Sequence, residues 1–207
     1  MWQGITIIAP SIPIKGKSTS KISRMLQLQE SYNQALSFAA SKHNGQLLPG
    51  TALPYLIHVI SVAMEVQVAG MHTMHFDLPF AVTVALLHDT IEDTGTSFKE
   101  ICESFGEPVA QGVLALTKFN NLPKEEQIAD SLRRIKLQPK EVWAVKLADR
   151  ITNLQAPPLD WDYKKRKRYR CDAQMIWEEL QVGNAYLSNR LMAKITDYQQ
   201  FVFTGDK

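Results

Sequence analysis

The sequence predicts an all-α fold, a bundle of seven to nine helices. Along most of the chain, apolar residues recur at steps of three and four, which places them on one face of a helix. Prolines and glycines fall between these periodic segments, where they can begin or end helices. No run of alternating apolar and polar residues is long enough to predict a strand.

The periodic segments divide the chain into an N-terminal arm and one domain. Residues 1–25 are rich in Ser, Lys and Pro and have little periodicity, so we expect an arm or extended segment there. Residues 26–203 are expected to form a single helical domain. Its helices are expected at about residues 24–44, 54–68, 77–88, 97–106, 108–118, 123–137, 140–154, 160–182 and 184–201.

Local signals mark the ends of several of these helices. Ser97 with Glu100 matches a capping box, in which side chains satisfy the unpaired N–H groups of the first turn. Asp77 and Asp160 stand at expected helix starts and can act as caps in a similar way. Gly106 suits a helix end because glycine readily adopts a positive φ.

The composition is that of an ordinary globular domain. The chain has 207 residues, 45% of them apolar, and a net charge of +2. Its two cysteines, Cys102 and Cys171, lack CxxC spacing, which argues against a disulfide framework or a thiolate zinc site. No signal-peptide pattern is present, and the longest apolar run, residues 78–87, is too short to cross a bilayer. We therefore expect a cytoplasmic protein without a membrane partner.

Residues 164–170 carry six basic side chains and no acidic one. Such a run can be a solvated helix face, a phosphate-attracting rim beside an active site, or a nucleic-acid contact. On a helix these charges would surround most of the axis, and only Tyr169 within the run offers a ring for stacking. The solvated face is therefore favoured, the rim is the second choice, and nucleic-acid binding is not expected.

Residues 86–95, LLHDTIEDTG, place an imidazole and three carboxylates directly after a run of apolar residues. The polar groups are His88, Asp89, Glu92 and Asp93. Residues four apart share a helix face, so a helix here would gather all four groups on one broad side. Because such groups are costly to bury unless they are paired or bind a cation, the pattern indicates a metal site near the core.

Two further positions can complete such a site. His58 has apolar neighbours on both sides, and Asp149 follows the largely apolar segment 142–148, with Asn153 one helical turn further on the same face. Taken alone, His58 is typical of a hydrogen-bonded core histidine, and Asp149 of a surface or capping group. The ordered set favours a metal site: a His, then His-Asp with Glu-Asp four residues later, then an Asp in an apolar helix.

This ordered set lies within several longer motifs. They are Phe38-Ala-Ala-Ser-Lys-His43, Pro54-Tyr-Leu-Ile-His58, Ala85-Leu-Leu-His-Asp-Thr-Ile-Glu-Asp-Thr94, Phe105-Gly106, Leu116-Thr-Lys118, Leu122-Pro-Lys124 and Val145-Lys-Leu-Ala-Asp-Arg-Ile-Thr-Asn-Leu154. Together they resemble the HD-domain phosphohydrolases, and more narrowly the hydrolase domain of the RelA/SpoT alarmone family with its small alarmone hydrolases. The resemblance extends over about residues 30–190 and implies an HD-domain helical bundle.

The resemblance also implies a metal centre and assigns roles to individual residues. One divalent metal ion, usually manganese in this family, would be bound by His58, His88, Asp89 and Asp149. The attacking water would be positioned or activated by Glu92 and Asp93. The substrate would be contacted by Tyr55, Lys124, Lys146 and Asn153. The ligand chemistry by itself fits Mn, Fe, Zn or Ni and does not choose among them.

The activity implied by the resemblance is removal of the 3′-pyrophosphate from guanosine tetraphosphate or pentaphosphate. Members of this family normally present adjacent basic residues before the motif that begins at Pro54, where this chain has Leu47-Leu48-Pro49. Two alternatives therefore stay open. One is an HD phosphohydrolase acting on another phosphorylated nucleotide or cofactor, and the other is a catalytically degenerate, metal-binding regulatory module. A homo-oligomer is compatible with each of them.

Overall fold

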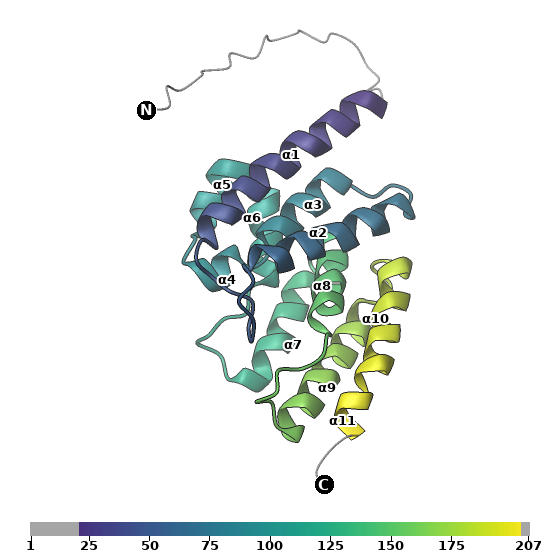
Figure 1. The fold of residues 1–207 in the computed structure, drawn as a ribbon. Helices are drawn as coiled ribbons and strands as arrows, with labels where there is room; N and C mark the ends of the chain where they lie inside the picture. Colours follow the sequence, from purple (N-terminus) through teal and green to yellow (C-terminus); the bar gives the residue numbers. More distant parts are fainter. Residues whose placement is uncertain (1–20, 204–207) are drawn as a thin grey trace.

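The computed structural model describes residues 21–203, and Figure 1 shows how their helices are arranged. The helices are α1 (Lys21–Lys42), α2 (Leu56–Met71), α3 (Leu78–Leu87), α4 (Thr90–Thr94), α5 (Phe98–Phe105), α6 (Glu107–Leu116), α7 (Lys124–Ile135), α8 (Lys140–Asn153), α9 (Tyr163–Leu180), α10 (Ala185–Tyr198) and α11 (Gln200–Phe203). Within these described residues there is no strand, only an isolated bridge between Leu47 and Pro54. The predicted all-α fold is confirmed. Apart from the short α4 and α11, the described residues form nine helices of eight residues or more, which agrees with the seven to nine that were expected.

Three helices begin more than one residue away from the expected start, and the smallest of these differences is at α2, which begins at Leu56 instead of residue 54. α1 begins at Lys21, so residues 21–25 are helical although they were expected in the N-terminal arm. The rest of that expected arm, residues 1–20, lies outside the described residues. α9 begins after Asp162 rather than Asp160, because the Asp162 Oδ1 accepts a hydrogen bond from the Lys165 N–H at 2.7 Å.

Other helix ends form where the sequence predicts them. The Asp77 side chain accepts from the Phe80 N–H at 3.1 Å at the start of α3. The Ser97 Oγ accepts from the Glu100 N–H at 3.2 Å at the start of α5. Gly106 ends α5 with a φ of +86°, a backbone conformation that favours glycine. These local signals are therefore sufficient to place three of the helix ends.

The central helix of the core is α3. Its residues 81–87 are all buried, and the helix packs against α1, α2, α6 and α8. α8 packs in turn against α2, α9 and α10, with α9 and α10 side by side in Figure 1. This packing brings together the start of α2, the end of α3 and the last turns of α8. The side chains at that junction are the ones that the sequence singles out as a metal site.

Two expectations from composition can be compared with the structure. Cys102 and Cys171 are both free thiols in the structure. Among the helices of residues 21–203, none combines the length and the apolar character needed to cross a bilayer. The apolar run 78–87 is the buried helix α3 instead.

Candidate metal centre

Packed helices supply the four candidate metal ligands. His58 is in the first turn of α2, and His88 directly follows α3. Asp89 precedes α4, and Asp149 lies near the end of α8. Both histidines and Asp149 are buried, whereas Asp89 is half-buried. The structure therefore brings together all four residues that the resemblance assigned to the metal.

The chain bends between His88 and Asp89 instead of continuing as one helix. α3 ends at Leu87, α4 begins at Thr90, and the two residues between them belong to neither helix. The buried Thr90 hydroxyl donates to the Leu87 carbonyl oxygen at 2.7 Å, which satisfies an acceptor left open at the end of α3. The helix expected to end at about residue 88 therefore ends at Leu87, and residues 90–94 form the separate short helix α4.

A second hydrogen bond orients each imidazole. The His88 Nδ1 lies 2.7 Å from the Ala85 carbonyl oxygen, which can only accept, so Nδ1 carries the proton. The Thr152 hydroxyl donates to the Asp149 carbonyl oxygen at 2.8 Å, and its oxygen lies 3.3 Å from the His58 Nδ1. These bonds leave the Nε2 atom of each imidazole to face the other ligands, as partners of this kind do for histidines that bind metals.

The ligand atoms of the centre lie close together. The two Nε2 atoms of His58 and His88 are 3.3 Å apart. The Asp89 Oδ2 lies 2.9 Å from the His88 Nε2 and 3.6 Å from the His58 Nε2. The Asp149 Oδ1 lies 3.5 Å from the His58 Nε2 and 3.8 Å from the His88 Nε2. A pair of imidazoles and a pair of carboxylates converging in this way fits a divalent metal ion, without a thiolate that would favour zinc.

The charges of the centre favour the binding of a cation. Burial disfavours the charged carboxylates, but the adjacent imidazoles and, for Asp149, the Lys146 ammonium hold the pKa of Asp89 and of Asp149 well below the usual range. The same attraction, acting against burial, raises the pKa of His58 to about 9 and also raises the pKa of His88. Protons on the imidazoles supply the positive charge when no metal is bound. A divalent ion would replace them.

Three residues predicted to contact substrate also contact the metal ligands. The Tyr55 hydroxyl donates to the Asp89 Oδ2 at 2.5 Å, and burial together with the Asp89 charge raises the pKa of this phenol. Lys146 is buried and donates to the Asp149 Oδ2 at 2.9 Å. The Asn153 side chain donates to the Asp149 Oδ1 at 2.5 Å. Of these three, only Asn153 also lines the neighbouring pocket.

The two carboxylates expected to handle water differ in their surroundings. Both oxygens of Glu92 are engaged by Lys118, one by its backbone N–H at 2.7 Å and the other by its ammonium. Asp93 is exposed and accepts from the Gln46 side chain at 3.1 Å. Partial burial and the nearby Asp89 charge raise the pKa of Asp93, against the effect of Gln46. Asp93 is therefore the carboxylate with an oxygen available to accept a proton.

Lys124 is the predicted site residue that the structure leaves apart from this centre. It is the exposed first residue of α7 and does not line the pocket beside the centre. Lys118 is half-buried, and its ammonium group pairs with Glu92. Substrate contact by Lys124 stays a prediction.

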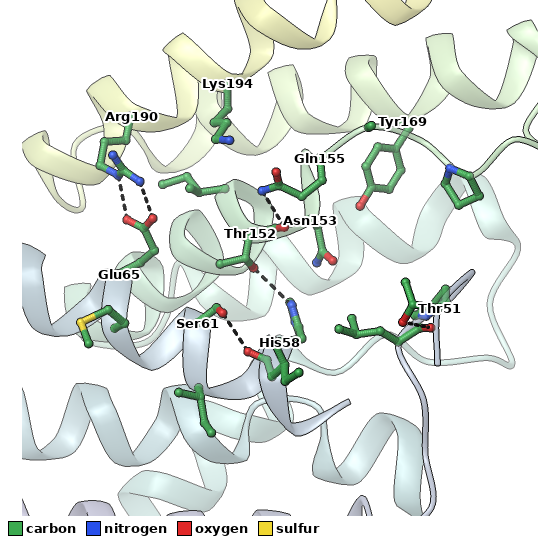
Figure 2. Close-up of a pocket in the computed structure, with 18 of the residues that line it drawn as sticks. Thr51, His58, Ser61, Glu65, Thr152, Asn153, Gln155, Tyr169, Arg190 and Lys194 are labelled. Atoms are coloured by element: carbon green, nitrogen blue, oxygen red, sulfur yellow. Dashed lines mark hydrogen bonds and ion pairs between the residues drawn. The ribbon is translucent and has the colours of Figure 1, made fainter. Parts of the chain in front are cut away.

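A pocket of about 820 Å³ opens beside His58. Figure 2 shows it between α2, the end of α8 and α10. Its lining residues are Leu48, Pro49, Thr51, Ile57, His58, Ile60, Ser61, Met64, Glu65, Ile151, Thr152, Asn153, Gln155, Ala156, Pro158, Trp161, Tyr169, Arg190 and Lys194. Most of this wall is apolar, and its polar groups are concentrated near the metal centre and on the α10 side.

The pocket contains functional residues that the sequence did not single out. Thr152 orients His58, while Arg190 and Lys194 supply the positive charges of the wall. The spacing of Arg190 and Lys194 places them on one face of a helix. Nothing in the sequence tells which face of that helix meets α2, because the contact joins segments more than a hundred residues apart.

The basic run 164–170 lies in the first half of α9 and contributes to the pocket mainly through aromatic rings. Trp161 and Tyr169 line the pocket with their rings 4.9 Å apart, edge to face. The Lys165 ammonium lies 4.4 Å from the centre of the Trp161 ring. Most other basic side chains of the run are exposed. Of residues 164–170 only Tyr169 lines the pocket, so the basic side chains form mainly the predicted solvated face.

Comparison with known proteins identifies the family of this chain. The HD domain family matches residues 35–184, which is well over half of the chain. The chain belongs to this family of HD-domain proteins, as the ordered set of His and Asp residues predicted.

Several curated relatives are named as hydrolases. A guanosine-3′,5′-bis(diphosphate) 3′-pyrophosphohydrolase from Aquifex aeolicus is 35% identical over 71% of this chain, which spans 20% of that longer protein. Proteins from Danio rerio and Drosophila melanogaster, both named guanosine-3′,5′-bis(diphosphate) 3′-pyrophosphohydrolase MESH1, are 32% and 30% identical. The alignments cover 76% and 77% of this chain and 88% and 90% of those two proteins.

A solved structure has the same fold. It is described by the words "A metazoan ortholog of SpoT hydrolyzes ppGpp and plays a role in starvation responses". It superposes with a TM-score of 0.72 at 28% identity and covers 83% of this chain and 96% of its own. The helical arrangement in Figure 1 is therefore the one found in that hydrolase.

Proposed function

We propose that this protein is a metal-dependent pyrophosphohydrolase that removes the 3′-diphosphate of guanosine-3′,5′-bis(diphosphate), or ppGpp. The observation that carries the proposal is the convergence of two imidazoles and two buried or half-buried carboxylates beside an open pocket. The names of relatives that match most of this chain support the same activity. Two free cysteines support a cytoplasmic location.

His58, His88, Asp89 and Asp149 would hold the metal ion, which we propose to be Mn²⁺. Imidazole and carboxylate ligands without thiolate are compatible with Mn²⁺. When bound, such an ion polarises a phosphoryl oxygen and lowers the pKa of the attacking water. The hydrogen bonds from Tyr55, Asn153 and Lys146 keep the carboxylates in place for that ion.

Asp93 is the residue that would take the proton from water. Its raised pKa brings the carboxylate closer to neutral pH, where proton transfer is more effective. Glu92 would act by holding Lys118 and fixing α4, because both of its oxygens are already engaged. Asn153, which contacts Asp149 and lines the pocket, would meet the sugar or phosphate of the substrate.

The reaction breaks one ester bond. The water oxygen attacks the inner phosphorus of the 3′-diphosphate. The bond between this phosphorus and the ribose 3′ oxygen then breaks. Asp93 accepts the proton of the attacking water, and the departing 3′ oxygen takes a proton from solvent. The products are pyrophosphate and guanosine 5′-diphosphate. No electron transfer is involved, so two imidazoles, carboxylates and one divalent ion suffice.

A second candidate is hydrolysis of another phosphorylated nucleotide or cofactor. It is favoured by the pocket wall at Leu48 and Pro49, where no cation is present to meet a phosphate. The metal centre and Asp93 would act in the same way on such a substrate. The two candidates differ only in what fills the pocket.

A product assay over a nucleotide panel tests these proposals. The panel contains ppGpp, nucleoside monophosphates and dinucleotide cofactors, each assayed for phosphate and pyrophosphate with and without Mn²⁺. We expect Mn²⁺-dependent pyrophosphate release from ppGpp. Asp93→Asn should lower kcat by about 10²- to 10⁴-fold, the usual effect of losing a general base, while Asp197→Asn, an exposed change on α10, should have no effect.

The other outcomes separate the alternatives. Release of phosphate from monophosphates alone would overturn the pyrophosphohydrolase proposal and favour the second candidate. Binding of Mn²⁺ without hydrolysis of any compound would indicate a metal-binding regulatory module.

A further inference from the structure

The pocket wall carries an unpaired positive charge at the end formed by α10. Besides His58, its charged residues are Glu65, Arg190 and Lys194. Arg190 is neutralised by Glu65, whose Oε2 accepts from the Arg190 Nε at 2.7 Å and whose Oε1 accepts from a second guanidinium nitrogen. Within the described part of the chain, no ion pair involves Lys194. The net charge of this end is therefore set by Lys194.

The pocket separates the Lys194 charge from the metal centre. Glu65 is seven residues beyond His58 in α2, which is about 10 Å along the helix axis at ~1.5 Å per residue. The ion pair holds Arg190 at that level, and α10 runs antiparallel to α2, so Lys194, one turn after Arg190, lies back toward the level of His58 on the opposite wall (Figure 2). Figure 2 shows Lys194 on the α10 side of the pocket, across from His58 on α2. A ligand must span the pocket to reach both.

The surfaces between these two ends fit a nucleoside rather than another charge. Ile57 and Ile151 form apolar wall near His58, and the rings of Trp161 and Tyr169 form another part of it. The loop side, with Leu48 and Pro49, also lacks a cation. A second anionic group on a bound molecule would therefore be attracted to α10, while its ring system packs against the apolar and aromatic wall.

We infer that Lys194 binds the 5′ phosphate group of the proposed substrate while the 3′ group lies at the metal centre. This inference rests on the proposed function for the phosphate that is cleaved. The contact with Lys194 itself is independent of cleavage.

Binding of two matched nucleotides to the Mn²⁺-loaded protein tests the contact without turnover of a diphosphate. Guanosine 3′,5′-bisphosphate has the distal phosphate, and guanosine 3′-monophosphate lacks it. By calorimetry, the wild type should bind the bisphosphate at least about tenfold more tightly, the effect of one charge-assisted hydrogen bond. Lys194→Met should abolish this preference, and Lys194→Arg should restore most of it.

The matched control is Lys99→Met, which removes an exposed lysine of α5 and should leave the preference unchanged. All variants should keep the wild-type melting temperature and Mn²⁺ affinity. With ppGpp as substrate, Lys194→Met should raise KM and leave kcat nearly unchanged, since the contact is the same in the ground and transition states.

Equal binding of the two nucleotides by the wild type, or an unchanged preference in Lys194→Met, would overturn the inference even if ppGpp is hydrolysed. Conversely, failure to hydrolyse ppGpp would overturn the proposed function and leave the measured role of Lys194 intact.

Discussion

Each of the four candidate ligands has a second partner that fixes its position. Thr152 and the Ala85 carbonyl oxygen orient the two imidazoles, and Tyr55 holds Asp89. Asp149 is held by both Lys146 and Asn153. Ligands already oriented in this way have less to rearrange when an ion enters, which strengthens binding. The centre is therefore shaped by residues that do not touch the metal.

The imidazole of His58 makes the stability of the metal-free protein dependent on pH. Its pKa rises from 6.5 to about 9 on folding because Asp149 and Asp89 outweigh the effect of burial. The folded state then binds more protons than the unfolded state, so the free energy of unfolding should fall as pH rises through this window. Urea denaturation of the metal-free protein at several values from pH 6.5 to pH 9 measures this fall in the free energy of unfolding.

Saturating Mn²⁺ should remove this pH dependence, since the ion replaces the protons. A metal-free protein whose free energy of unfolding is constant across the window would contradict the account of the His58 charge.

Lys146 provides a second test at this scale. Lys146→Met leaves the buried Asp149 carboxylate without its ammonium partner, so metal-free protein should lose about 3–5 kcal/mol of stability, the usual cost of breaking a buried ion pair. Mn²⁺ should recover much of it by supplying the missing positive charge. Denaturation with and without Mn²⁺ measures both effects. Lys124→Met, at an exposed site, is the control, and a loss in Lys146→Met no larger than in this control would refute the prediction.

The sequence predicts the four ligands better than their surroundings. The order of His and Asp residues is enough to propose the set, and the structure brings all four together. Tyr55 and Lys146, for which substrate contact stays a prediction, donate to Asp89 and Asp149, and these contacts were not predicted because sequence spacing does not tell which acceptor a donor will reach. Lys194 was missed because its position depends on the contact between α2 and α10.

At the scale of the helices, the bend between α3 and α4 positions two adjacent ligands. Neither proline nor glycine marks the bend, so the stretch resembles a continuous helix in sequence. In the structure, the Thr90 hydroxyl satisfies the Leu87 carbonyl oxygen just where the helix stops. By contrast, the starts of α3 and α5 were predictable, because each is set by a cap within three residues of it.

Replacing Thr90 with Val tests this bend while keeping the shape of the side chain. The change removes a buried hydrogen bond, so we expect the free energy of unfolding to fall by about 1–3 kcal/mol. Mn²⁺ affinity should also fall, because His88 and Asp89 flank the bend. Calorimetric titration with Mn²⁺ measures the affinity.

Thr117→Val is the control for this prediction. Thr117 is also buried, and its hydroxyl also donates to a carbonyl oxygen of the preceding turn, at the end of α6, but no metal ligand is next to it. Equal loss of Mn²⁺ affinity in the two variants would show that the bend has no specific role.

For the whole molecule, the arrangement of helices connects the metal centre to a pocket of two contrasting ends. α2 contributes to both ends, with His58 near its start and Glu65 two turns later. α10, packed against α8 and α9, supplies the cations across the pocket. The all-α class and most helix positions follow from periodicity and caps. Which helices face one another across the pocket depends on long-range packing, which local patterns in the sequence do not encode.

The central claim is that one divalent ion, held by these four ligands, is required for hydrolysis. Metal-free protein titrated with Mn²⁺ in the presence of ppGpp, at a protein concentration well above the dissociation constant for the ion, tests it most directly. Pyrophosphate release should be absent at first, rise linearly and reach a plateau at one Mn²⁺ per chain, and Asp149→Asn should abolish this response. Release that does not depend on added Mn²⁺, or that is unchanged in Asp149→Asn, would contradict the claim.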